Sequence, residues 1–210
     1  ILTAMATKKE VNYQDIYTEG ITKITDIDFK YAAKMGTSIK LFGSSRMEED
    51  QVFAWVAPVM IGREHPLYSV SDVYNGILVR GNMLGTTMYY GSGAGKLPTA
   101  SAVVADIIEE AGHLDNHVSL GWSSEKLDIA PMEISCHKYF VRVSGPYEPK
   151  KQLIEQCFGS CQIMTLEGLN ECALLTEKMS EKQFKKALFE LEEKLGGMYQ
   201  EVLQTIRAQL

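Results

Sequence analysis

The sequence predicts an α+β protein in which an antiparallel or mixed sheet is covered by helices and followed by a small ferredoxin-like module. Two observations predict this class. In the first part of the chain, helical segments come first and alternating strands follow over residues 38–90. In the last third, residues 137–210, the expected order is strand, helix, strand, strand, helix, strand. Elements with one apolar face stabilise each other by packing in layers.

The first expected elements are helical and lie within residues 1–35. Asp26 is a residue type that caps helix N-termini, and Gly36 suits the left-handed position after a helix. Polar and apolar residues alternate over residues 38–42, as in a half-buried strand, and residues 51–56 form the next strand. A sheet of this kind keeps one face free for helices or for a second subunit.

Turn residues separate these strands from a hairpin. Residues 46–50 are charged and predict a turn, while Pro58 indicates an irregular exit from the second strand. Residues 76–80 and 83–90 are the next two strands, and the glycine and asparagine at 81–82 predict a tight hairpin turn between them.

The last third of the chain contains the second group of elements. Ser180 is suited to cap a helix whose apolar residues share one face, and the glycines at 196–197 end that helix. We expect strands at 138–144, 160–166, 171–176 and 202–208, and helices at 149–158 and 181–195. Their order is that of a ferredoxin-like module, which by itself indicates no function.

Composition excludes several classes of function. The chain has 210 residues, 45% of them hydrophobic, and a net charge of −6. It lacks the basic stripe that nucleic-acid binding requires, so we expect no nucleic-acid partner. It also lacks an apolar run of membrane length and a signal peptide, so we expect no membrane partner and a cytoplasmic location.

Cysteine and histidine spacings predict no metal site. Cys157 and Cys161 have three residues between them rather than the two of a redox or zinc pair. We therefore expect reduced thiols at all four cysteines, Cys136, Cys157, Cys161 and Cys172. His113 and His117 are four residues apart but lack the glutamate of a metalloprotease helix, so we interpret both as surface residues.

The most informative segment is a glycine-rich turn between a strand and a helix. Gly91, Gly93 and Gly95 leave the backbone bare, and Pro98 suits the first turn of the helix that follows. Unpaired N–H groups at the helix start favour a binding cleft here, although a purely structural turn is an equal alternative. A phosphate loop is excluded, because such a loop needs four residues between its first glycine and Gly-Lys, whereas Gly91 and Gly95 have three between them.

Several segments in order resemble homoserine dehydrogenase. The most specific is Gly-Ala-Gly-Lys-Leu-Pro-Thr-Ala-Ser-Ala-Val-Val at residues 93–104. Supporting segments lie at residues 19–22, 39–41, 56–58, 65–70, 73–76 and 90–106. The resemblance covers about residues 1–118, and by element order residues 137–210 resemble the ACT-type regulatory domain of longer bacterial members.

The resemblance implies an NAD(P)-dependent oxidoreductase that interconverts L-homoserine and L-aspartate 4-semialdehyde on the route to threonine and methionine. In this family the glycine turn lies against the nicotinamide, which implies cofactor-binding roles for Gly93, Ala94 and Gly95. The family's nucleotide-binding domain and its catalytic Asp and Lys align before Ile1, so no catalytic or metal-binding residue is assigned here. We expect this chain to be inactive alone, and its residues do not distinguish NAD from NADP.

The resemblance also implies a domain plan and partners. Residues 1–96 would belong to the substrate and dimerisation domain, 97–118 to a helix returning to the nucleotide-binding domain, 119–136 to a linker and 137–210 to the ACT-like domain. We expect a homodimer through the sheet of residues 38–90, with ACT–ACT pairing as a further contact.

The ACT-like domain departs from its pattern at the turn where an amino-acid effector binds in typical members. In the turn over residues 144–149, Gly145 comes early, and Lys150 follows where the pattern has glycine. Two roles for the domain stay open, amino-acid binding and assembly alone. The alternative for the whole protein is a non-enzymatic ACT-domain protein that senses amino acids or mediates assembly.

Overall fold

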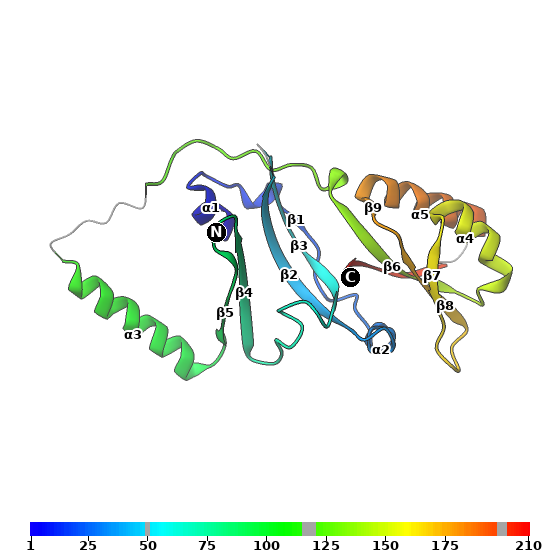
Figure 1. Cartoon of the computed structure of the whole chain (residues 1–210), viewed down its shortest axis with the longest axis horizontal. Coiled ribbons are helices and arrows are strands. Elements are labelled where there is room, and N and C mark those ends of the chain that lie inside the picture. Colours follow the sequence, from blue (N-terminus) through cyan, green and yellow to red (C-terminus); the bar gives the residue numbers. More distant parts are fainter. Residues whose placement is uncertain (49–50, 115–120, 197–200) are drawn as a thin grey trace. The chain divides into compact units, whose positions relative to one another are not determined.

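The computed structural model divides into two compact units (Figure 1). It describes residues 1–48, 51–114, 121–196 and 201–210. The first unit comprises residues 1–62 and 123–210, and the second comprises residues 63–122. The predicted boundaries near residues 96, 118 and 136 concern the domain plan of the family and stay a prediction.

The first unit is built on one mixed sheet, which confirms the predicted α+β class. The strand order is β1-β3-β10-β6-β8-β7, with β2 also paired to β3 and β9 to β6. Strand β3 runs parallel to β1 and β10, whereas the other pairs are antiparallel. The strands are β1 (Tyr17–Thr18), β2 (Thr37–Glu48), β3 (Gln51–Gly62), β6 (Cys136–Ser144), β7 (Cys161–Met164), β8 (Glu171–Thr176), β9 (Met179–Ser180) and β10 (Val202–Gln209).

The predicted strand-helix-strand-strand-helix-strand module is present at the C-terminal side of this sheet. Its elements are β6, α4 (Lys151–Phe158), β7, β8, α5 (Glu181–Leu195) and β10. Its four main strands lie in the order β10-β6-β8-β7, and α4 and α5 lie side by side over one face (Figure 1). The core beneath these helices contains Tyr139, Val141, Val143, Ile154, Phe158, Cys172, Leu174, Phe184, Ala187 and Leu191.

The opposite face of the same sheet packs against α2 (Asp26–Lys34). Side chains alternate across β6, so Val141 lies in the core under α4 and α5 while Phe140 packs with Tyr31 of α2. Strand β10 pairs with β3 as well as β6, with Arg207 opposite Val59. The module and the N-terminal segment therefore share one continuous sheet between two helical layers.

Local signals predicted several ends of elements correctly, and one was wrong. Ser180 caps α5 by accepting the N–H of Gln183, and Gly36 adopts a left-handed φ of 67° after α2, as predicted. The predicted cap of α2 at Asp26 was wrong, because Thr25 occupies the cap and Asp26 is the first helical residue. The reason is Asp28, whose carboxylate accepts the Thr25 N–H at 2.7 Å.

The N-terminal region is less helical than expected, and its strands are longer. Residues 1–35 contain α1 (Leu2–Thr7), the short helix η1 (Tyr13–Asp15) and β1 before α2. Residues 46–48 extend β2, whereas 49–50 of the expected charged turn lie outside the described residues. Strand β3 also continues through Pro58, which neither β1 nor β10 pairs with, so the missing N–H of proline is tolerated.

The second unit contains the hairpin β4 (Tyr74–Gly81) and β5 (Gly85–Ser92), followed by α3 (Lys96–Gly112). The predicted hairpin is confirmed, but its turn spans residues 82–84 because Gly85, at φ 75°, supplies the left-handed residue. The strands between residues 38 and 90 form two sheets rather than the single sheet expected, since β2 and β3 pair in the first unit and β4 and β5 with each other.

Candidate functional sites

The predicted glycine turn connects the end of β5 to the start of α3. The Gly93 N–H donates to the Val73 carbonyl at 3.1 Å, which ties the turn to the residue before β4. Gly95 caps α3 with a φ of 116°, where a side chain is strained. Its carbonyl accepts the Thr99 hydroxyl at 2.8 Å and the Thr99 N–H at 3.2 Å. Pro98 lies in the first turn of α3, as predicted.

The glycines of this turn differ in what surrounds them. A Cβ on Gly93 would collide with the end of the exposed Asn75 side chain, so any side chain at 93 would force Asn75 to move. A Cβ on Gly95 would meet only the Pro98 ring, at 3.5 Å, among the described residues. Packing against Asn75 thus favours glycine at 93, while the backbone face of Gly95 is open among the described residues.

Helix α3 exposes its apolar side chains. None of its residues is buried within the described chain. Five large apolar side chains are each more than half exposed, Leu97, Val103, Val104, Ile107 and Ile108. Most of the stability of a helix in a protein comes from packing of its apolar face, and the described residues do not bury this one.

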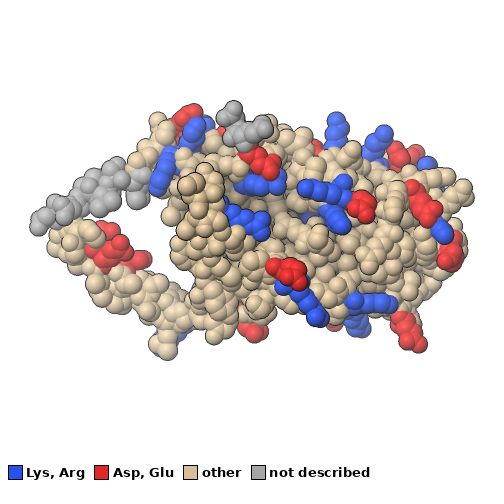
Figure 2. Space-filling view, in the orientation of Figure 1, with Lys and Arg blue, Asp and Glu red and all other residues tan. Residues whose placement is uncertain are grey.

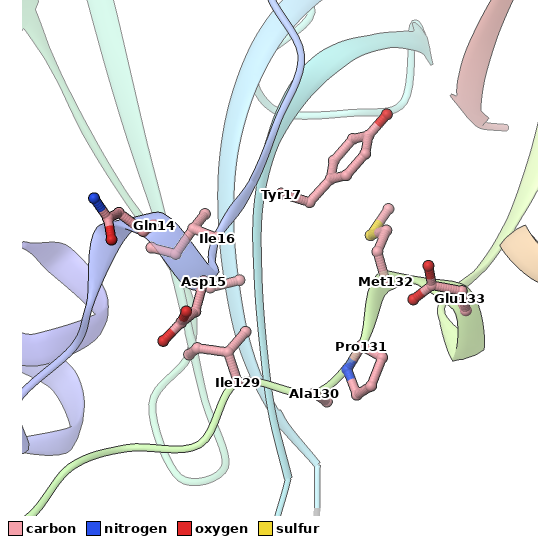
Figure 3. A pocket seen from close by; sticks show the side chains of 10 residues that line it. Gln14, Asp15, Ile16, Tyr17, Ile129, Ala130, Pro131, Met132 and Glu133 are labelled. Atoms are coloured by element: carbon pink, nitrogen blue, oxygen red, sulfur yellow. The ribbon is translucent and has the colours of Figure 1, made fainter.

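A pocket in the first unit was not predicted from the sequence. It has a volume of about 280 Å³. Its lining comes from three separate segments (Figure 3). These are residues 14–17 around η1 and β1, Ala54 of β3, and residues 129–133 of the segment that leads to β6. Local sequence signals could not find it, because its two carboxylates, Asp15 and Glu133, come from segments more than a hundred positions apart.

Two buried arginines of the first unit, Arg142 and Arg207, form ion pairs. On the face shown in Figure 2, surface charges of both signs are interspersed. Arg207 of β10 donates to both carboxylate oxygens of Glu181 and, at 2.7 Å, to Glu19. Its guanidinium lies 4.8 Å from the centre of the Tyr17 ring. Burial alone would lower the pKa of Arg207, but the carboxylates around it raise that pKa above its ordinary value.

Arg142 forms the second buried network. It contacts Asp28 of α2 at 2.7 Å and Glu171 of β8 at 2.8 Å. All three side chains are less than one tenth exposed. Tyr139 belongs to the Arg207 network, because its hydroxyl donates to Glu181 at 2.9 Å. Its pKa is raised by burial first and then by the charge and the hydrogen bond of Glu181. These networks join the C-terminal module to the N-terminal segment.

Two of the histidines, His137 and His113, have contacts that the structure describes. His137 is buried, its Nε2 lies 2.9 Å from the Ser135 hydroxyl, and burial followed by the charge of Arg207 lowers its pKa to about 4. His113 is exposed, with Nδ1 2.8 Å from the Glu109 carbonyl oxygen, and His117 lies outside the described residues.

The cysteines are free thiols, and burial raises the pKa of Cys161 to about 11. Among the described residues, no group of three or more His, Cys, Asp or Glu side chains is arranged to hold a metal. No helix in the described part of the chain is long and apolar enough to cross a membrane.

Comparison with known proteins identifies the family. The family model described as homoserine dehydrogenase matches residues 1–108, which is just over half of the chain. The chain belongs to the homoserine dehydrogenase family, which confirms the resemblance seen in the sequence.

Two homoserine dehydrogenase sequences and one crystal structure match the chain over longer stretches. The homoserine dehydrogenase of Neisseria gonorrhoeae is 33% identical over 210 residues, covering 91% of this chain and 48% of that protein. That of Helicobacter pylori is 41% identical over 141 residues, covering 66% of this chain and 33% of that protein. The crystal structure of a homoserine dehydrogenase from Thiobacillus denitrificans superposes with a TM-score of 0.80 at 30% identity, covering 99% of this chain and 51% of that one. The chain thus spans about half the length of these relatives or less.

Proposed function

We propose that the full-length protein is an NAD(P)-dependent homoserine dehydrogenase of the cytoplasm. It interconverts L-homoserine and L-aspartate 4-semialdehyde in the branch that leads to threonine and methionine. The family match over residues 1–108 is the observation that carries this proposal. The bound nicotinamide supplies hydride transfer, and the residues of this chain bind and orient it.

The turn formed by Gly93, Ala94 and Gly95 contributes to the cofactor site. The open backbone face at Gly95 fits a ligand that approaches the main chain closely. The first N–H groups of α3 lie beside Gly95 and favour a ligand group that accepts hydrogen bonds. Gly93 supports this arrangement by packing on Asn75, which fixes the turn against β4.

Helix α3 braces the nucleotide-binding domain in this proposal. Its exposed apolar surface supports a partner that is itself apolar, and a domain of the same protein meets that need without a second gene product.

The protein is proposed to work as a homodimer. The hairpin supports this, because Tyr74 and Tyr90 stack with ring centres 5.0 Å apart yet are 44% and 54% exposed. Exposed stacked aromatic residues are typical of protein interfaces. Pairing of the C-terminal modules and binding of an amino-acid effector are further parts of this proposal.

The test compares the full-length protein with this 210-residue chain. Homoserine-dependent formation of NADH or NADPH should occur with the full-length protein and be absent with the chain alone. The chain lacks an assigned group to move the hydroxyl proton, and hydride transfer requires one. A full-length protein without this activity that still binds free amino acids would instead favour the non-enzymatic alternative.

A further inference from the structure

The turn between β6 and α4 holds a lysine that folds back over its own backbone. Lys150 ends the short helix η3 (Glu148–Lys150) just before α4. Its Nζ donates to the Ser144 carbonyl and, at 2.5 Å, to the Glu201 carboxylate. The Lys150 side chain is only 17% exposed, which is unusual for lysine.

The backbone beneath this ammonium is shaped to admit it. Gly145 has a φ of 78°, and a Cβ added there would lie 3.3 Å from the Lys150 Nζ. The Gly145 N–H donates to the Asn170 carbonyl at 2.8 Å, which holds the bare face of the turn toward Lys150. A side chain at position 145 would therefore crowd the ammonium as well as strain the backbone.

The site differs from the surface ion pairs of the chain. The pair between Lys185 and Glu133 spans 3.9 Å, with both side chains about half exposed. Lys150 instead has acceptors from two strand ends, Ser144 of β6 and Glu201 just before β10, and the Ser144 N–H donates back to the Glu201 carbonyl at 2.8 Å. A carbonyl and a carboxylate at hydrogen-bond distance are the acceptors that a primary ammonium requires.

We propose that this turn is a binding site for a primary ammonium group and that the Lys150 ammonium occupies it in the folded protein. The side chain holds the end of β6 and the start of β10 together and closes the site to free amines. A free amino acid can act on this turn only by displacing Lys150. Removing the side chain beyond Cβ opens a space that a small primary amine can fill.

Amine rescue tests the proposal in the full-length protein. Hydrogen exchange of the backbone amides in residues 144–150 reports the turn locally. Lys150→Ala should speed this exchange roughly tenfold, the scale of one lost charge-assisted hydrogen bond. Propylamine, which matches the deleted atoms, should restore most of the protection at millimolar concentrations. Wild-type protein should not respond to propylamine.

Matched controls separate recognition of the ammonium from general effects. Lys150→Met fills the space without the charge, so it should lose protection and gain nothing from propylamine. Lys151→Ala changes the neighbouring lysine and should leave exchange unchanged. 1-Propanol, which has the shape but not the ammonium, should not rescue Lys150→Ala.

Three results would overturn the proposal. They are unchanged exchange in Lys150→Ala, failure of propylamine to restore it, and equal rescue of Lys150→Ala and Lys150→Met. Should Lys150→Ala fail to fold, Glu201→Gln is the variant to measure, because it keeps the shape of the Glu201 side chain and removes its charge. Faster exchange of residues 144–150 in Glu201→Gln would support the site, and unchanged exchange would refute it.

Discussion

The two compact units differ in where their apolar side chains lie. The first unit buries its large apolar residues on both faces of one sheet and pairs its buried arginines internally. In the second unit, no residue described over 63–114 and 121–122 is buried. Its hairpin and α3 expose isoleucines, valines and tyrosines instead.

This difference shows which unit has a hydrophobic core of its own. Burial of apolar area is the main favourable term in folding, so the first unit contains the source of its own stability. The second unit has no such core among its described residues. The proposed nucleotide-binding domain and second subunit would cover its exposed apolar side chains.

The largest expected effect comes from breaking a buried network of the first unit. Arg142→Met leaves Asp28 and Glu171 buried without their cation and should lower the free energy of unfolding by about 3 to 5 kcal/mol. Denaturant unfolding of the 210-residue chain measures it. Arg46→Met is the control, because the pair with Glu48 is about half exposed and should change that energy by at most about 1 kcal/mol. Equal effects of the two variants would contradict the contrast between buried and exposed charge.

Acid should destabilise the first unit through His137. Burial, followed by the charge of Arg207, lowers its folded pKa to about 4, below the ordinary value of 6.5. The unfolded chain therefore binds the proton first, and stability falls as the pH drops from about 7 toward 4. The loss from this residue should reach about 2.5 kcal/mol near pH 4.5.

Unfolding curves of wild type and His137→Phe across this pH range measure the effect. The variant should show a flatter dependence on pH, while His113→Gln, a change at an exposed histidine, should keep the wild-type slope. An unchanged slope in His137→Phe would show that other groups cause the acid sensitivity.

The sequence predicted the features that depend on neighbouring residues and missed those that depend on contacts between distant ones. The strand Glu171–Thr176 and the helix Glu181–Leu195 were predicted to the residue, because alternation and caps are written in neighbouring residues. The contacts of Arg142 were not predicted, since Asp28 is 114 positions away. The same holds for the site, where Gly95 was found by its residue type but the collision between Gly93 and Asn75 depends on strand pairing.

The two glycines of the turn should separate structural and cofactor roles in the full-length enzyme. Gly95→Val places a side chain on the open backbone face and should raise the KM for the cofactor roughly tenfold, equivalent to about 1.4 kcal/mol. Gly93→Ala forces Asn75 to move and should mainly lower the free energy of unfolding, by about 1 kcal/mol. This loss is seen as a lower melting temperature. Both quantities are measured on one preparation of each variant. A lowered melting temperature with unchanged KM in Gly95→Val would return the whole turn to a structural role.

The smallest effect is expected on α3 in the isolated chain. Ile108 is 67% exposed, so Ile108→Glu should change the unfolding free energy of the 210-residue chain by no more than about 0.5 kcal/mol. Leu191→Ala, at a fully buried position of the first unit, is the matched contrast and should cost about 2 to 5 kcal/mol. In the full-length protein the order should change, because a glutamate at 108 would be buried against the proposed nucleotide-binding domain without a partner. There Ile108→Glu should lower both the melting temperature and the rate of homoserine oxidation. Strong destabilisation of the isolated chain by Ile108→Glu would instead mean that α3 packs within this chain, and the contrast between the two units would fail.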